Sequence, residues 1–140
     1  MMVDADVIAR RLLALNESLR ELGREEASNA AELAANPILR AAVERWLQIA
    51  IEACIDIAYH VVAEEGWTPP ESGRAAFVSL AAHGKLPLDL AERLGSAAAL
   101  RNLLIHDYVA VDLQRLALVV RDDLGDLREL AARAAGWMTD

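Results

Sequence analysis

The stretch from residue 100 to residue 108 concentrates polar side chains at the end of an otherwise apolar run: Arg101, Asn102, His106, Asp107 and Tyr108. Phosphate chemistry needs a fixed cation and a proton carrier close together, and Arg101 and His106 supply both. The alternative is a structural role, in which the stretch is a helix C-terminus and His106 caps the last carbonyl groups. The residue types alone leave these two interpretations about equal.

The spacing of Arg101 and His106 limits how one phosphate can reach both side chains. Five residues in an ideal helix correspond to about 140° around the axis and about 7.5 Å along it. A regular helix therefore cannot aim both side chains at one phosphate. Either the helix loosens before His106, with Arg101 pointing outward from its last turn, or a second copy of the chain completes the site. Tyr108 would share a side with His106 in an extended exit segment.

Composition favours one helical domain spanning residues 1–140, built mainly from Leu and Ala. Hydrophobic residues make up 55% of the chain but aromatic residues only 4%, which favours helix over sheet. The single cysteine, Cys54, excludes an internal disulfide and is predicted to be a core residue. The net charge of -8 argues against a general nucleic-acid binder. Residues 72–121 are nevertheless net-positive, and an acidic body with such a locally basic site suits a small anionic target or a basic partner.

Nothing in the sequence predicts export or insertion into a membrane. The N-terminus becomes acidic at Asp4, unlike a signal peptide. No window approaches 18 uncharged apolar residues, so no membrane span is predicted. We therefore expect a cytoplasmic protein.

Helical periodicity and capping residues predict an all-α, up-and-down bundle of four main helices plus one short helix. The first helix should run to Leu22, with residues 23–35 as a looser continuation that projects past the core. Asn36 and Pro37 should then start a central helix that runs to about residue 65. The later helices are expected over residues 72–83, 88–105 and from a cap at Asp112 to a stop at Gly136.

One narrow polar line interrupts the apolar central helix, with residues four apart on one face: Gln48, Glu52, Asp56 and His60. A metal site of the carboxylate-bundle type is one interpretation, but no other helix supplies a Glu-x-x-His pair. The favoured interpretation is that Asp56 and its neighbours line a cleft or a dimer contact. There they would hold Arg101 or His106 by hydrogen bonds.

The spacing of Arg101, His106 and Tyr108 resembles the R-x4-H-x-Y signature of HepT-like toxins, within the HEPN superfamily of small helical ribonucleases. The similarity extends to residues 47–60, to Gly66-Trp67 and to residues 80–94. It covers about residues 40–120.

The resemblance implies a HEPN bundle that forms a homodimer and brings two Arg/His pairs to one cleft. It implies a type VII toxin with metal-independent endoribonuclease activity, with tRNA among the expected RNA targets. Arg101 and His106 would be catalytic, while Asn102 and Asp107 would bind substrate or support the site. No cofactor is expected for cleavage.

The same resemblance implies an off-switch at Tyr108. Family members are paired with an MntA-like nucleotidyltransferase antitoxin, which uses ATP and Mg to transfer AMP to the motif tyrosine. The added phosphate would repel RNA and fill the cleft. Two alternatives stay open: a non-catalytic HEPN module that binds nucleotide or RNA for a partner nucleotidyltransferase, and, more remotely, a metal-carboxylate bundle enzyme.

Overall fold

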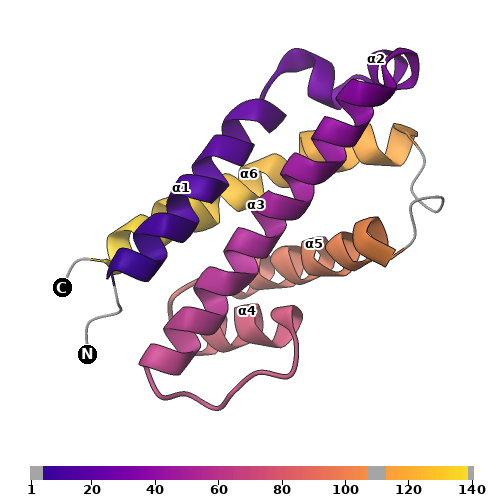
Figure 1. The fold of residues 1–140 in the computed structure, drawn as a ribbon. Helices are drawn as coiled ribbons and strands as arrows, with labels where there is room; N and C mark the ends of the chain where they lie inside the picture. The colour runs from indigo at the N-terminus through magenta and orange to yellow at the C-terminus, as the bar shows by residue number, and fades with distance from the viewer. Residues whose placement is uncertain (1–4, 107–112, 139–140) are drawn as a thin grey trace.

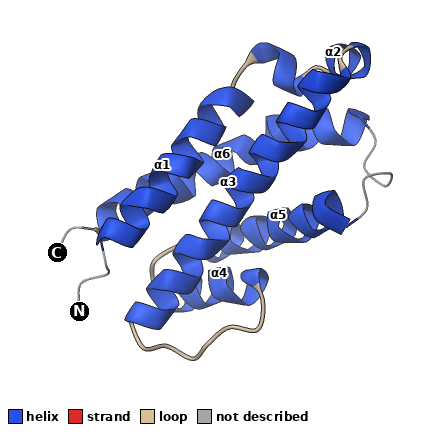
Figure 2. Cartoon of the chain, in the orientation of Figure 1, coloured by secondary structure: helices blue, strands red, loops and turns tan. Residues whose placement is uncertain are grey.

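The computed structural model describes residues 5–106 and 113–138, and all regular structure in these ranges is helical (Figures 1 and 2). The main helices are α1 (Ala5–Leu22), α3 (Pro37–Glu64), α4 (Gly73–Ala82), α5 (Leu88–His106) and α6 (Leu113–Trp137). A 3₁₀ turn, η1 (Glu25–Ser28), and a short helix, α2 (Ala30–Ala35), connect α1 to α3. The all-α prediction is confirmed.

The helix α3 is central, as predicted, because it contacts each of the other five α-helices. α1 lies along one side of α3, α4 and α5 lie on another, and α6 passes behind (Figure 1). The apolar residues of α3 fill the core together with inward-facing side chains of other helices, such as Ile8, Phe77 and Leu94. Cys54 is fully buried there, and burial raises the pKa of its thiol.

Capping residues start α3 and α4 where the sequence predicts, whereas the predicted cap at Asp112 lies outside the described residues. The Asn36 side chain accepts hydrogen bonds from the backbone N–H groups of Ile38 and Leu39, and Pro37 occupies the first helical position of α3. Ser72 caps α4 in the same way. Gly84 follows α4 with a φ of 78°, a conformation that glycine adopts without strain.

The prediction of four main helices plus one short helix is wrong in number, because the described residues contain six α-helices. The difference lies at residues 23–35, which do not continue α1 past the core. Asn29 is extended, and its side chain caps α2 by accepting from the N–H of Glu32. The resulting bends return Ala27 and Leu33 to the core, where both are buried. At the other end, α6 continues one residue beyond Gly136.

One helix qualifies the prediction about membrane spans. Within the described ranges, α3 alone is long and apolar enough to cross a membrane by length and composition. The 18-residue window of α3 that meets these criteria is 56% buried inside the bundle. A central bundle helix meets the same criteria, so its position in the core accounts for its composition.

Candidate functional site

The polar line of α3 lies along the side of the bundle where α1 and α5 approach. The first two residues of the line, Gln48 and Glu52, contact the C-terminal part of α5. Gln48 Nε2 donates to the carbonyl oxygen of Leu104 at 3.5 Å, and Glu52 Oε2 lies 4.0 Å from Arg101 Nε. The line therefore connects α3 to the helix that carries the predicted catalytic residues.

The last two residues of the line, Asp56 and His60, have other partners. Asp56 Oδ2 lies 3.5 Å from Nε of Arg11, which comes from α1. His60 Nε2 lies 3.8 Å from Glu64 Oε1, one turn further along α3. The predicted line is thus one surface, but each of its residues contacts a different group.

Arg101 is only half-buried, with 22% of its side chain exposed. Its Nη1 donates to Asn102 Oδ1 at 3.1 Å. Its Nε is buried and has no hydrogen-bond partner among the described residues. Arg101 points toward Glu52 on α3, so the prediction that it looks outward from the last turn is wrong.

His106 is the last residue of α5, and the helix is continuous from Leu88 to this point. The helix therefore does not loosen before His106, which removes the first of the two alternatives drawn from the spacing. Within one chain, Arg101 and His106 are therefore about 140° apart around the axis of α5. A composite site with a second copy of the chain is the alternative that stays open.

Two of the predicted site residues, Asp107 and Tyr108, lie outside the described residues. Their predicted roles, support of His106 and acceptance of AMP, stay predictions. Asn102 is within the description, exposed on the last turns of α5 and bonded to Arg101.

Asp56 forms its ion pair with Arg11 of α1 and not with Arg101, whereas its predicted hydrogen bond to His106 and its predicted place in a cleft or dimer contact stay predictions. Partial burial raises the pKa of Asp56, and nearby Glu52 also raises it, whereas Arg11 and Arg101 act in the opposite direction. Arg101 therefore lowers the pKa of Asp56 by electrostatic attraction, although the ion pair of Asp56 is with Arg11 of α1. A side chain one helical turn away, Glu52, occupies the position expected for Asp56.

Neither Glu52 nor Arg11 was predicted as an individual site residue. The four-residue spacing places Glu52 on the correct face of α3. Spacing within a helix does not tell which neighbouring helix lies over each turn, so no feature of the sequence indicates Arg11.

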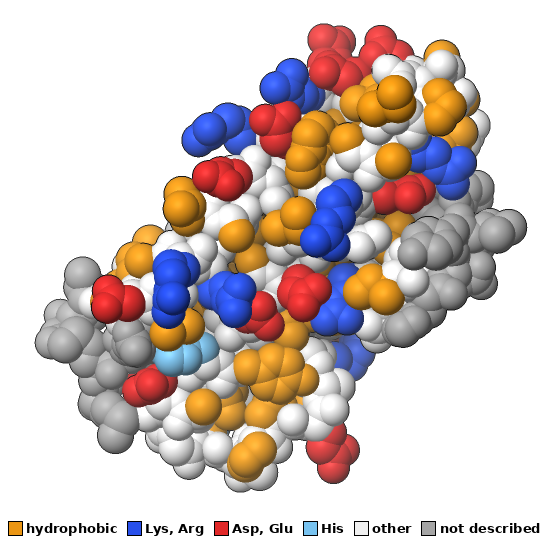
Figure 3. Space-filling view, viewed as in Figure 1, with side chains coloured by type: hydrophobic (Ala, Val, Ile, Leu, Met, Phe, Trp, Pro, Cys, Tyr) orange, Lys and Arg blue, Asp and Glu red, His pale blue; other side chains and the backbone are white. Residues whose placement is uncertain are grey.

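The α1–α3 seam also forms a groove of about 220 Å³, whose lining includes, beside three apolar residues, four charged ones: Arg11, Arg45, Glu52 and Asp56. On the face that carries α1 and α3, acidic and basic side chains are intermixed (Figure 3). Across residues 5–106 and 113–138, no three histidine, cysteine or acidic side chains gather closely enough to hold a metal ion. The metal-site interpretation of the polar line therefore has no support in the described geometry.

A family model described as "Ribonuclease HepT-like" matches residues 14–134 of the chain. Among curated proteins, the chain is 35% identical over 83 residues to "mRNA nuclease HepT" from Shewanella oneidensis. That match covers 59% of this chain and 62% of the relative. It is also 29% identical over 77 residues to "tRNA nuclease HepT" from Aphanizomenon flos-aquae, covering 55% of this chain and 52% of the relative. The chain thus matches less than two-thirds of the length of each curated relative.

Similarity to a solved structure covers more of the molecule. The fold superimposes with a TM-score of 0.85 and 25% identity on a structure described as a tri-AMPylated Shewanella oneidensis HEPN toxin in complex with MNT antitoxin. That likeness covers 94% of this chain and 98% of the other. The fold of this chain and the fold of that toxin therefore agree over nearly their full length.

Proposed function

This chain belongs to the HepT-like ribonuclease family, and we propose that it is a metal-independent endoribonuclease toxin of a type VII toxin–antitoxin system. The observation that supports this proposal most is the state of Arg101. Its guanidinium is held at the seam of α3 and α5 with its Nε buried and unbonded among the described residues. A cation held at this seam, five residues before a histidine, is suited to bind an incoming phosphate through its terminal nitrogen atoms.

The proposed chemistry uses Arg101 and His106 in different roles. In the transition state the 2′-oxygen of RNA bonds to phosphorus while the bond to the 5′-oxygen breaks. Arg101, which stays cationic, stabilises the charge on the phosphate oxygens. His106 exchanges a proton with the 2′-hydroxyl or with the leaving oxygen near neutral pH.

The active form in this proposal is a homodimer. The continuous helix α5 separates Arg101 and His106 by about 140°. A second copy that presents its own α5 would bring an arginine and a histidine from different chains to one phosphate. Asn102, which is bonded to Arg101 Nη1, and Asp107 would support this composite cleft.

Neutralisation would occur at Tyr108 through AMP transfer by a cognate MntA-like nucleotidyltransferase. ATP and Mg would serve that antitoxin and not the cleavage reaction. The description of the structurally similar toxin as tri-AMPylated and bound to MNT antitoxin supports this part of the proposal. The names of the relatives include an mRNA nuclease and a tRNA nuclease, so both RNA classes are substrates to test. A cytoplasmic location follows from such targets.

The test is cleavage of labelled mRNA and tRNA by the purified chain in the presence and absence of a chelator. We expect cleavage that the chelator does not affect and that His106→Ala abolishes without loss of helicity. Tight binding of a nucleotidyltransferase with no cleavage by the wild type would instead identify a non-catalytic HEPN module. Cleavage that depends on added metal would contradict the proposal directly.

A second experiment tests the off-switch separately. The chain is co-produced with its cognate nucleotidyltransferase, and its intact mass is measured for multiples of an AMP adduct. Tyr108→Phe should fold and cleave RNA but escape neutralisation. Continued AMP transfer to the Phe variant at another position would contradict the assignment of Tyr108.

A further inference from the structure

The guanidinium of Arg101 is approached from two sides by side chains of the bundle. On the Nη1 side it donates to Asn102 on the same helix at 3.1 Å. On the Nε side the nearest ion-pair partner is Glu52 Oε2 at 4.0 Å, across the seam between α5 and α3. Glu52 is thus the side chain of another helix that faces the guanidinium.

The Nε atom itself gives Glu52 a role. Buried N–H donors almost always have an acceptor, because an unbonded one loses its interaction with water without compensation. Arg101 Nε is buried and has no acceptor among the described residues. The gap of 4.0 Å to Glu52 exceeds an ordinary N–H···O distance by only about 1 Å. A rotation of the Glu52 side chain, which is 51% exposed, can close this gap.

The neighbouring carboxylate does not compete for this position. Asp56 lies one turn along α3 and pairs with Arg11 of α1, with 3.5 Å between Oδ2 and Nε. The seam therefore distributes two carboxylates between two arginines, one pair for each neighbouring helix. Glu52 is the carboxylate left for Arg101.

We propose that Glu52 is a positioning residue that holds the Nε edge of Arg101, so that the terminal nitrogen atoms face the RNA phosphate. The inference rests on the proposed ribonuclease function. A carboxylate at Nε fixes the plane of the guanidinium without removing its charge. Glu52 touches neither substrate nor reacting atoms in this arrangement, and it acts only through Arg101.

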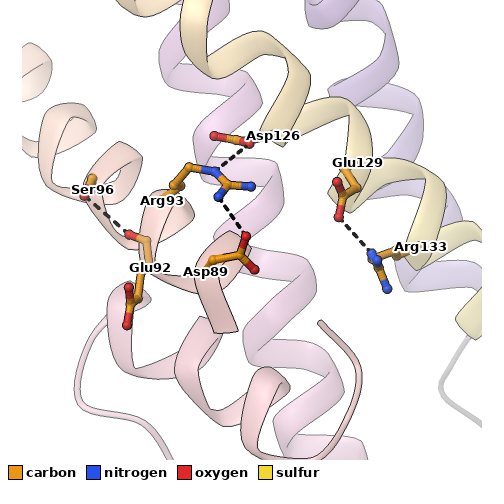
Figure 4. A network of polar contacts seen from close by, with 7 residues as sticks. All are labelled: Asp89, Glu92, Arg93, Ser96, Asp126, Glu129 and Arg133. Atoms are coloured by element: carbon orange, nitrogen blue, oxygen red, sulfur yellow. Dashed lines mark hydrogen bonds and ion pairs between the residues drawn. The ribbon is translucent and has the colours of Figure 1, made fainter. Parts of the chain in front are cut away.

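The chain offers a matched control for this interaction. Arg93, also on α5, receives a carboxylate from another helix, because its Nε donates to Asp126 of α6 at 3.0 Å (Figure 4). Asp126→Ala therefore removes an interhelical carboxylate from an α5 arginine that lies away from the proposed site. Effects that arise from the loss of any such ion pair will appear in both variants.

The first readout is the NMR signal of the Arg101 Nε–H group, assigned by its absence in Arg101→Lys. Glu52→Ala should shift this signal and accelerate its exchange with water, while Asp126→Ala leaves it unchanged. An unchanged signal in Glu52→Ala would overturn the inference. This readout needs no cleavage, so it distinguishes loss of the contact from failure of the proposed ribonuclease function.

The second readout is the division of the effect between kcat and KM for RNA cleavage. Glu52→Ala should lower kcat by about tenfold and leave KM within about twofold, because misorientation of Arg101 affects chiefly the transition state. Glu52→Gln, which keeps an acceptor, should lose less, and Asp126→Ala should stay within about twofold of wild type.

A double-variant cycle completes the test. In the Arg101→Lys background there is no Nε edge to hold, so adding Glu52→Ala should change kcat by less than about twofold. An equal loss in both backgrounds would show that Glu52 acts independently of Arg101 and would overturn the inference. A wild-type kcat in Glu52→Ala would do the same while leaving the proposed function intact.

Discussion

Arg93 and Arg101 belong to the same helix, yet the fold occupies their guanidinium groups to different extents. Arg93 donates from Nε to Asp126 at 3.0 Å and from Nη1 to Asp89 at 3.2 Å (Figure 4). Arg101 has its nearest carboxylate at 4.0 Å and one hydrogen bond, to its sequence neighbour Asn102. The Arg93 guanidinium is thus hydrogen-bonded to two carboxylates, whereas the Arg101 guanidinium is hydrogen-bonded to none among the described residues.

Exposure makes this difference informative. The Arg93 side chain is 50% exposed, so water could satisfy its donors without help from the protein. The Arg101 side chain is only 22% exposed, and burial increases the need for partners. The less exposed arginine therefore has the weaker set of contacts. A fold that optimised stability alone would show the opposite, so Arg101 is the one available for a ligand.

The largest effect should come from Arg101→Ala, with Arg93→Ala as the comparison. Arg101→Ala should reduce RNA cleavage by about 100-fold or more, since it removes a charge that stabilises the transition state. Arg93→Ala should leave the cleavage rate within about twofold of wild type. Single-turnover cleavage measures both, and circular dichroism verifies that each variant is folded. Equal losses of activity would contradict the distinction between the two arginines.

A smaller effect should follow from releasing the end of α5. Gln48 bonds the Leu104 carbonyl from α3 at 3.5 Å, and this contact helps to fix the turn that follows Arg101. Gln48→Ala should lower the free energy of unfolding by about 0.5–1.5 kcal/mol, measured by urea denaturation. Gln114→Ala on α6, where the side chain is exposed, is the control and should change it by less than about 0.5 kcal/mol. A Gln48 variant as stable as this control would mean that the long hydrogen bond contributes nothing.

The acidic residue beside the Arg101 seam should titrate at a raised pKa. Burial raises the pKa of Asp56, and Arg11 opposes the shift. Because the folded pKa exceeds the unfolded one, Asp56 lowers stability progressively as pH rises through the interval between them. Arg11→Ala should raise this pKa further, as measured by carboxyl NMR. The pKa of Asp123, which burial also raises, should not respond. A lower Asp56 pKa in the Arg11 variant would contradict the assigned pairing.

The sequence could predict the features that depend on residues close together in the chain. Asn36, Pro37 and Ser72 begin helices because their side chains or ring act on the adjacent backbone. The four-residue spacing of Glu52 and Asp56 likewise predicts a shared face, since it follows from helix geometry alone.

Contacts between helices were harder to predict. Glu52 and Asp56 lie about 6 Å apart along the axis of α3, and only the packing of α1 and α5 decides which carboxylate meets which arginine. The prediction that residues 23–35 continue the first helix past the core failed for a similar reason. The cap at Asn29 competes with continuation of the helix, and the gain from burying Leu33 decides the outcome.

The smallest effect concerns Asp89, whose carboxylate accepts from Arg93 on the exposed side of α5. This hydrogen bond is the main reason why the pKa of Asp89 is below its usual range. The folded pKa is therefore lower than the unfolded one, so the contribution of Asp89 to stability is present above the unfolded pKa. It is lost as pH falls through the folded pKa. This dependence has the opposite sign to that of Asp56.

Arg93→Ala should return the pKa of Asp89 toward its ordinary value and leave that of Asp56 unchanged, as measured by carboxyl NMR. The loss of stability should be small because the pair is exposed and screened by solvent. If the pKa of Asp89 stayed low in this variant, the backbone N–H of Leu90, which also lowers it, would be the dominant partner. Asp126 would then be the main carboxylate bound to Arg93, and the contrast with Arg101 would rest on a single carboxylate.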